Sequence, residues 1–148
     1  MPVLRGRLRT EGALVEVRIG LSRLEVRRLR NASRPVPAPV AVRALIDTGA
    51  QDSCVDPAAL GLLVLLQRGI TLANVPALGG LAPAYELDAS LTVIHPSGDP
   101  RQDLIVPDLP LVQLALGVLG YQVLVGRDVL AGCKFLYNGS RGRFRLSY

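Results

Sequence analysis

The chain has few aromatic side chains: four Tyr and two Phe among 148 residues, and no Trp. Its hydrophobic core must therefore be built from Val, Leu, Ile and Ala. Hydrophobic residues make up 49% of the chain and charged residues 20%, a composition typical of globular proteins rather than disordered ones. Fifteen Gly and eleven Pro indicate many turns and short strands. We therefore expect one all-β domain over residues 1–148, with segments 1–11 and 21–39 irregular or peripheral.

Histidine and cysteine are also scarce. The one histidine, His95, and the two cysteines, Cys54 and Cys133, provide neither a Cys-x-x-Cys pair nor paired histidines. No metal site, no cofactor and no disulfide framework is therefore expected. Both cysteines fit the role of small buried hydrophobes better than a redox role. Cys54 as a nucleophile lacks a base, because His95 falls in a segment that reads as a hairpin loop.

No apolar run is suited to crossing a membrane as a helix. The longest, Leu109 to Val125, is interrupted by a proline, two glycines and two glutamines. The chain also lacks a basic start followed by an apolar block and a small-residue cleavage site, so no secretory signal is visible. We therefore expect a cytoplasmic protein with no membrane partner.

Lysine is nearly absent, since Lys134 is the one example. The formal net charge of +5 comes from arginine, a balance that can attract nucleic acid or acidic proteins. The arginines are spread along the chain, and no aromatic residue is interleaved with the densest group, between Arg23 and Arg34. Base stacking is therefore unsupported. A solvated face is the favoured interpretation, and no nucleic-acid partner is expected, although an arginine-rich nucleic-acid binder stays open as an alternative.

The most informative stretch runs from Val40 to Ser53. An apolar run of β-formers and alanines ends at a carboxylate, Asp47, which is followed by the hydroxyl of Thr48 and by Gly49. A buried carboxylate costs free energy unless it is hydrogen-bonded or protonated. We therefore expect donors nearby, namely the hydroxyl and backbone amides that the glycine allows to turn back. The alternative is an Asx-type turn after a strand, which is a common use of such an aspartate.

Two further segments favour a catalytic role for Asp47. Residues 75–94 read as a hairpin with Gly79 and Gly80 at its tip. Residues 121–130 read as an apolar strand that meets the triplet Gly126-Arg127-Asp128 at the start of a short helix. Each motif is weak by itself, but their combination in this order is specific.

In this combination the sequence resembles the retropepsin-like aspartic proteases, the family of the retroviral proteases and their single-lobed cellular relatives. The three family signatures occur in order as residues 46–50, the glycine-tipped hairpin, and residues 124–130. The resemblance spans roughly Gly12 to the C-terminus. It implies a closed β-barrel with one lobe per chain and the activity of an aspartic endopeptidase.

The chemistry of that family implies a homodimer. Peptide hydrolysis by carboxylates needs two of them, one to activate water and one to protonate the carbonyl oxygen. Two carboxylates about 3 Å apart do not both ionise easily, so one stays protonated. This chain has one Asp-Thr-Gly triplet, so the second acid must come from another copy. The resemblance thus implies that Asp47 of each subunit meets its partner's Asp47 at a two-fold axis.

The resemblance also assigns roles to the neighbours of Asp47. Thr48 would brace the two catalytic loops against each other, and Gly49 would meet the substrate backbone. An extended peptide would lie as an added strand between this floor and a flap that excludes water. The residues implied to contact substrate are Ala50, Gln51 and Asp52 in the floor, and Leu78, Gly79, Gly80 and Leu81 at the flap tip.

The triplet Gly126-Arg127-Asp128 is implied to support the loop at residues 47–53, the Asp47 loop. In the retroviral members the arginine pairs with an acid at the position that Gln51 occupies here. Arg127 is therefore expected to pair with Asp52 or Asp128 instead. The segment 109–120 is a second departure, because it is longer than in the compact viral enzymes.

Other elements follow from local patterns. A strand is expected over residues 13–19, followed by Gly20. Residues 21–34 fit a loose helical stripe as well as a surface hairpin, and an irregular or edge segment is expected there. Asp56-Pro57 suits the start of a short helix over residues 57–66 that is interrupted or capped at Gly61. Residues 111–119 are open between helix and loop, and another short helix is expected over residues 128–133. Residues 134–148 should form a hairpin around Asn138-Gly139.

Three functions stay open at this point. The first is an active dimeric aspartic endopeptidase, and the second is a module of the same fold that binds peptides or dimerises without useful activity. The arginine-rich nucleic-acid binder is the third. Fold does not guarantee function, but the intact triplet of Asp47, Thr48 and Gly49 favours catalysis. Leu and Val in the expected pocket suggest apolar side chains on either side of the scissile bond.

Overall fold

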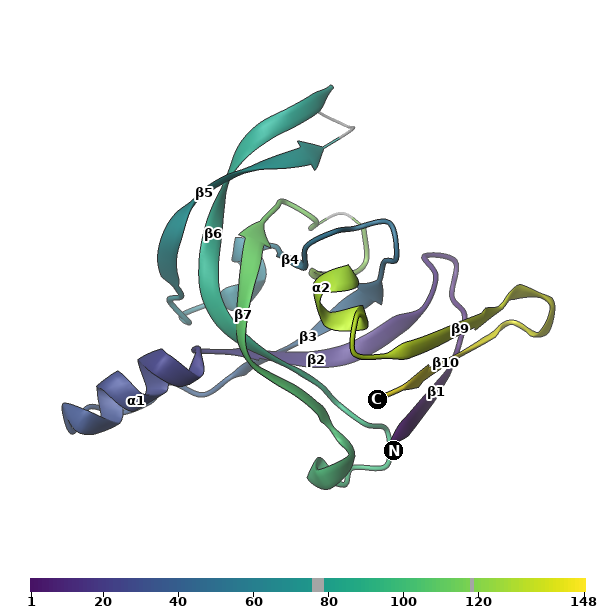
Figure 1. Ribbon diagram of the computed structural model, residues 1–148, viewed down its shortest axis with the longest axis horizontal. Helices are drawn as coiled ribbons and strands as arrows, with labels where there is room; N and C mark the ends of the chain where they lie inside the picture. The colour runs from purple at the N-terminus through teal and green to yellow at the C-terminus, as the bar shows by residue number, and fades with distance from the viewer. Residues whose placement is uncertain (76–78, 118) are drawn as a thin grey trace.

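The computed structural model describes residues 1–75, 79–117 and 119–148 and is mainly β, with 48% of the residues in strands. Six strands close into a barrel, and a separate three-stranded sheet joins the two ends of the chain (Figure 1). The expectation of an all-β fold is confirmed. Among the described residues, no helix is long and apolar enough to cross a membrane.

The barrel is closed by pairing strands that are distant in sequence. Around the ring they are β2 (Leu14–Gly20), β3 (Val40–Ile46), β8 (Val123–Val125), β4 (Cys54–Val55), β7 (Leu104–Gln113) and β6 (Gly80–Val93), and β6 pairs with β2 to complete it. Strands β3 and β8 are parallel, with Ile46 level with Val125. The ends of these two strands therefore lie side by side, one leading into Asp47 and the other into Gly126.

The core is aliphatic, as the scarcity of aromatic residues predicts. Strand β6 buries every second residue from Leu87 to Val93, and β2 does the same from Val15 to Ile19. This period of two is the pattern of strands with one face on a core. Complete burial of a side chain such as Ile19 or Leu91 stabilises the fold by roughly 1.5–3 kcal/mol.

A long hairpin projects from the barrel. Strand β5 (Leu66–Val75) pairs with β6 from Leu66 opposite Asp88 to Val75 opposite Gly80, with a bulge between Gln67 and Gly69. Strand β5 is the end strand of its sheet. In Figure 1 this β5–β6 hairpin extends beyond the barrel on the same side as the loop between β3 and β4.

The two chain ends form what we call the terminal sheet, with strand order β1 (Val3–Arg7), β10 (Arg143–Ser147) and β9 (Lys134–Asn138). In the segment 1–11, which was expected to be irregular or peripheral, residues 3–7 form a regular strand that lies in a different sheet from the barrel. The hairpin expected over residues 134–148 is confirmed. Its two strands are joined by a short 3-10 helix, η4 (Gly139–Arg141).

Residues 21–34 contain a helix, so the expected irregular or edge segment is wrong over α1 (Arg23–Asn31). The side chain of Ser22 accepts the amide of Glu25 at 3.2 Å. Ser and Glu at this spacing are the signature of a helix start. The helix buries none of its residues fully and projects from the barrel (Figure 1), so the segment is peripheral.

Several element boundaries differ from those expected. The helix predicted over residues 57–66 is a single 3-10 turn, η1 (Pro57–Leu60), which ends at Gly61, where an interruption or cap was expected, and Leu66 already belongs to β5. Its predicted cap is confirmed, since Asp56 accepts the amide of Ala58 at 2.9 Å. Strand β7 continues to Gln113, into the segment that was open between helix and loop. A second 3-10 turn, η3 (Pro100–Gln102), precedes it, and the helix expected over residues 128–133 is α2 (Arg127–Leu130).

Candidate active site

Asp47 stands at the end of a strand that is held on both sides. The amide of Asp47 donates to the carbonyl of Val125 at 3.0 Å, and the amide of Ile46 donates to the carbonyl of Ala13 at 2.9 Å. Asp47 is half-buried, whereas Thr48 and Gly49 are exposed. The barrel therefore fixes the backbone of the acid and leaves the next two residues accessible.

The Asp47 loop begins with a tight turn. The amide of Gly49 donates to Oδ1 of Asp47 at 2.9 Å, and the amide of Ala50 donates to the carbonyl of Asp47 at 3.2 Å. A Cβ added at Gly49 would lie 3.1 Å from the same carboxylate oxygen. The glycine therefore lets the backbone approach the acid closely. This geometry serves a catalytic carboxylate and also fits an Asx-type turn, so it does not separate the two interpretations.

Hydrogen bonds between Ser53, the last residue of the Asp47 loop, and Asp128 of α2 anchor this loop. Asp128 Oδ2 accepts the amide of Ser53 at 2.8 Å, and Asp128 Oδ1 accepts its hydroxyl at 2.6 Å. Oγ of Ser53 also accepts the amide of Gly126 at 3.0 Å. Ser53 is fully buried, and its bond from the Gly126 amide is buried with it, whereas its two bonds to the exposed Asp128 are partly buried. Sequence reasoning did not single out Ser53, because its partners are more than 70 residues away.

Backbone contacts reinforce this support. The amide of Arg127 donates to the carbonyl of Ala50 at 2.9 Å, and the amide of Asp128 donates to the carbonyl of Gln51 at 3.2 Å. A Cβ at Gly126 would lie 2.7 Å from the carbonyl carbon of Asp52. Position 126 must therefore be glycine for α2 to approach the Asp47 loop this closely.

The expected ion pair of Arg127 with Asp52 or Asp128 is not found in the part of the chain that the structure describes. The carboxylate of Asp128 is occupied by Ser53, and the Arg127 side chain is exposed. Arg127 thus contributes its amide rather than its charge to the Asp47 loop.

The β5–β6 hairpin carries an apolar face that continues the core face of the barrel. Side chains two residues apart on a strand, and those directly opposite on its partner, share one face. Leu81 and Tyr85 are therefore on the face that Leu87 buries farther along β6, and Ile70 is directly opposite Tyr85. Beyond the barrel this face is uncovered, since Leu81 is 70% exposed and Ile70 is 65% exposed.

This uncovered face also includes Leu72, which pairs with Pro83. A hollow lies beside it, lined by Ile70, Pro83, Ala84, Tyr85 and Gln113. Of the residues implied for the flap tip, Gly79 and Gly80 have φ angles of 83° and 131°, which favour glycine. Leu78 lies outside the described residues. The hairpin therefore offers an apolar surface for side chains that arrive from outside this chain.

The negative charge of Asp47 contributes to raised pKa values at two nearby side chains. Burial, and then the charges of Asp128, Asp52 and Asp47, raise the pKa of the Cys54 thiol to about 11. The thiol therefore stays protonated at neutral pH, which agrees with the prediction that Cys54 is not a nucleophile. Burial also raises the pKa of Tyr121, with the charge of Asp47 contributing. Tyr121 is a neighbour of the acid that the sequence motifs did not indicate.

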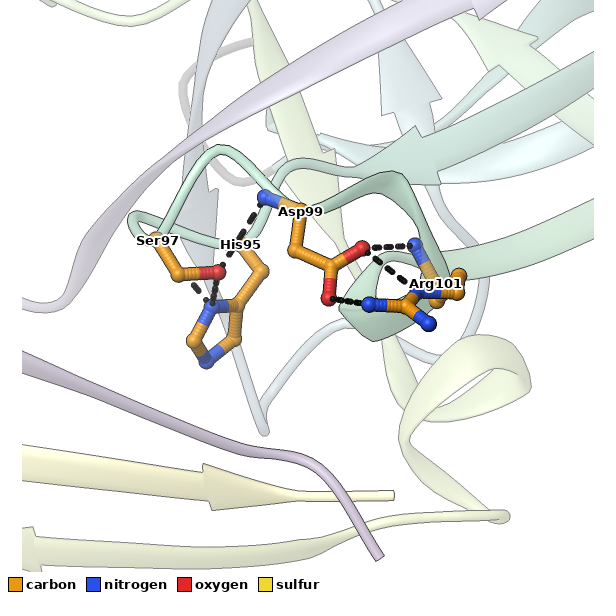
Figure 2. A network of polar contacts seen from close by, with 4 residues as sticks. All are labelled: His95, Ser97, Asp99 and Arg101. Atoms are coloured by element: carbon orange, nitrogen blue, oxygen red, sulfur yellow. Dashed lines mark hydrogen bonds and ion pairs between the residues drawn. The ribbon is translucent and has the colours of Figure 1, made fainter.

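A second polar cluster superficially resembles a Ser-His-Asp triad (Figure 2). Ser97 Oγ lies 2.8 Å from Nδ1 of His95, and Nε2 of His95 lies 3.2 Å from the carbonyl of Val3. In a triad a carboxylate holds the histidine nitrogen opposite the serine. Here Asp99 binds Arg101 at 3.0–3.1 Å, and Arg101 lowers the pKa of Asp99. The cluster therefore closes a turn and ties it to β1, and it is not arranged for nucleophilic catalysis.

Over residues 1–75, 79–117 and 119–148, no group of three or more His, Cys, Asp or Glu side chains is placed to hold a metal ion. Comparison with known proteins adds no relative: no family model, no curated protein and no solved structure matches the chain. The resemblance to retropepsin-like proteases thus depends on the three sequence motifs.

Proposed function

We propose that the protein is an aspartic endopeptidase of the retropepsin-like type that works as a homodimer. The observation that carries the proposal is the placement of Asp47. A half-buried acid begins a loop whose other end is fixed by bonds between Ser53 and Asp128, and two exposed residues follow the acid on the side toward which the β5–β6 hairpin projects. A purely structural Asx turn has no need of such a brace or of an uncovered apolar hairpin.

In the proposed dimer, the Asp47 carboxylates of two subunits share one proton. The ionised carboxylate takes a proton from a water molecule while the oxygen of that water attacks the carbonyl carbon of the peptide bond. The protonated carboxylate donates its proton to the carbonyl oxygen. Thr48 and Gly49 lie at the surface in a single chain, where the partner's loop and the substrate backbone would cover them. Gly49 also holds Asp47 through its amide.

The β5–β6 hairpin would close over an extended peptide. The peptide would bond through its main chain, while its apolar side chains contact the face formed by Ile70, Leu72, Leu81 and Tyr85. Because this face is apolar, we expect apolar residues on either side of the scissile bond. Charged residues on both sides of mapped cleavage sites would contradict this expectation.

The second candidate is a peptide-binding or dimerisation module without activity. The apolar hairpin face would serve such a module equally well, so one experiment must separate the two. We would incubate a peptide library with the wild type and with Asp47→Asn from acidic to neutral pH, after light scattering has established the dimer. Asp108→Asn is the matched control, since Asp108 forms an ion pair with Arg23 outside the site.

The proposal expects the wild type and Asp108→Asn to cleave peptides and Asp47→Asn to have lost this activity. A pepstatin-like transition-state mimic should block the cleavage. Binding of peptides by a dimeric wild type without cleavage would favour the module. Cleavage that survives in Asp47→Asn would refute the assignment of Asp47.

A further inference from the structure

The positive charge of the chain is concentrated at its two ends. Residues 1–10 and 129–148 contain no acidic side chain and seven cationic ones: Arg5, Arg7, Arg9, Lys134, Arg141, Arg143 and Arg145. Of the 17 Lys and Arg residues ten remain for residues 11–128, which hold all 12 Asp and Glu residues and so carry a formal charge of −2. The net charge of +5 therefore comes entirely from the chain ends, which form the terminal sheet.

Strand pairing arranges four of these arginines as an array. Arg5 lies directly opposite Arg145, and Arg7 lies directly opposite Arg143. All four are exposed, and the pairing rule puts them on one face of the sheet. The opposite face carries Leu4, Phe144 and Leu146, which are buried. The outer face of the terminal sheet is therefore a cationic surface backed by the hydrophobic core.

The array surrounds a shallow hollow and has no acidic partner of its own. The hollow is lined by Arg5, Arg7, Arg141, Arg143 and Arg145 together with Leu136 and Asn138. Across the described parts of the chain, none of these five arginines forms an ion pair. Like charges directly opposite each other destabilise a sheet, so an external anion would relieve repulsion that the fold leaves uncompensated.

The chemistry of the surface favours one kind of occupant. A second copy is disfavoured, because a two-fold contact would bring the same cations together. The planar guanidinium fork suits phosphate oxygens, and a nucleic acid supplies one anion with every nucleotide. An acidic peptide would need an almost unbroken run of Asp and Glu to do the same.

We propose that the outer face of the terminal sheet binds nucleic acid through its phosphodiester backbone. The site is separate from Asp47 and does not depend on the protease activity. It also reverses the expectation, drawn from the arginines between Arg23 and Arg34, that no nucleic-acid partner exists. The terminal arginines lie at opposite ends of the sequence, and only the pairing of β1 with β10 brings them together.

Fluorescence anisotropy with a labelled single-stranded oligothymidine and oligouridine, over a series of salt concentrations, tests the proposal on the full chain. The test variant is Arg5→Gln/Arg145→Gln. The matched control is Arg27→Gln/Arg30→Gln, which removes the same charge from exposed positions on α1. Thermal melting of both variants checks that they are folded.

The wild type should bind with an affinity that falls steeply with salt. The test variant should lose about 0.7 per arginine from the slope of log K against log salt, and its affinity should fall on the order of tenfold to thirtyfold at ~0.1 M salt. The control should bind like the wild type. Absence of salt-dependent binding by the wild type, or an equal loss in the α1 control, overturns the proposal. Tighter binding of polyglutamate or of phosphatidylserine vesicles than of the oligonucleotide overturns it as well.

Discussion

Ser53 connects the two segments that build the candidate site. Its hydroxyl donates to Asp128 and accepts the amide of Gly126, and its own amide donates to the same carboxylate. These bonds hold the Asp47 loop against the start of α2 without any ion pair from Arg127. The acid at position 128 is therefore a structural acceptor in this chain, and it fixes the end of the Asp47 loop at Ser53.

Ser53→Ala should destabilise the fold by about 1–3 kcal/mol, because it leaves the buried Gly126 amide without its acceptor and removes the shorter of the two bonds to Asp128 Oδ1, which keeps the amide of Val129. Urea unfolding followed by circular dichroism, at one protein concentration, measures the change. Ser97→Ala is the control, since Ser97 is exposed and its loss should cost less than about 0.5 kcal/mol. Equal effects of the two substitutions would mean that the brace is unimportant.

The thiol of Cys54 gives a pH-dependent prediction. Its pKa is raised from the ordinary value of 9.0 to about 11, mainly by burial. The folded state therefore holds the proton more tightly than the unfolded state. The resulting contribution to stability is complete below pH 9 and is lost as the pH rises toward 11.

At pH 8 the folded protein should contain about a hundredfold less Cys54 thiolate than the unfolded chain, and alkylation should be slowed accordingly. Iodoacetamide labelling followed by mass spectrometry, with and without urea, measures the two rates. Cys54→Ser should remove the labelling at this site and flatten the loss of stability above pH 9. Labelling of the folded protein as fast as that of the unfolded chain would contradict the assigned environment.

At the scale of elements, the two faces of the β5–β6 hairpin differ in the contact with substrate that we propose for them. Leu72 is 64% exposed on the face that continues the core, and Leu66 is 47% exposed on the opposite face, where it pairs with Asp88. Leu72→Ser should lower kcat/KM for peptides with apolar side chains by about tenfold. Because the residue is exposed, the melting temperature should hardly change.

Leu66→Ser provides a matched control on the same strand. It should leave both kcat/KM and the melting temperature near the wild-type values. If the two variants show the same kcat/KM, the core-side face of the hairpin does not contact substrate.

The arginine array of the terminal sheet should also cost stability in the unbound protein. Arg145→Gln removes the cation directly opposite Arg5. We expect the variant to be more stable by a few tenths of a kcal/mol at low ionic strength, with the gain disappearing at high salt. Thermal unfolding at both ionic strengths measures this, with Arg30→Gln on α1 as the control. A stability loss in Arg145→Gln at low salt would show that the array is compensated.

Local patterns predicted the local parts of this structure. The strand before Asp47, the cap at Asp56 and the hairpin at the C-terminus were all visible as short-range signals. The helix α1 also had such a signal, the spacing of Ser22 and Glu25, but the arginines around it obscured the period of its apolar residues. The contact of Ser53 with Asp128 was not predictable in this way, because it joins residues 75 positions apart.

At the scale of the whole molecule, barrel closure places two motifs of the sequence together, the one around Asp47 and the one around Gly126. The parallel pairing of β3 with β8 sets Asp47 beside Gly126. The antiparallel pairing of β1 with β10 joins the chain ends into the terminal sheet. One chain then presents a single candidate acid. The proposed activity accordingly belongs to an assembly of two chains, in which each subunit supplies half of the catalytic pair.

The most direct test of this account is to mix wild-type and Asp47→Asn subunits at constant total concentration, after exchange of subunits, and to measure peptide cleavage. If each active site needs an Asp47 from both chains and the subunits assemble at random, an equal mixture retains about a quarter of the wild-type activity, because mixed dimers are inactive. If one chain carries the whole site, activity falls in proportion to the wild-type fraction and about half remains. The first result supports the shared site, and the second contradicts it.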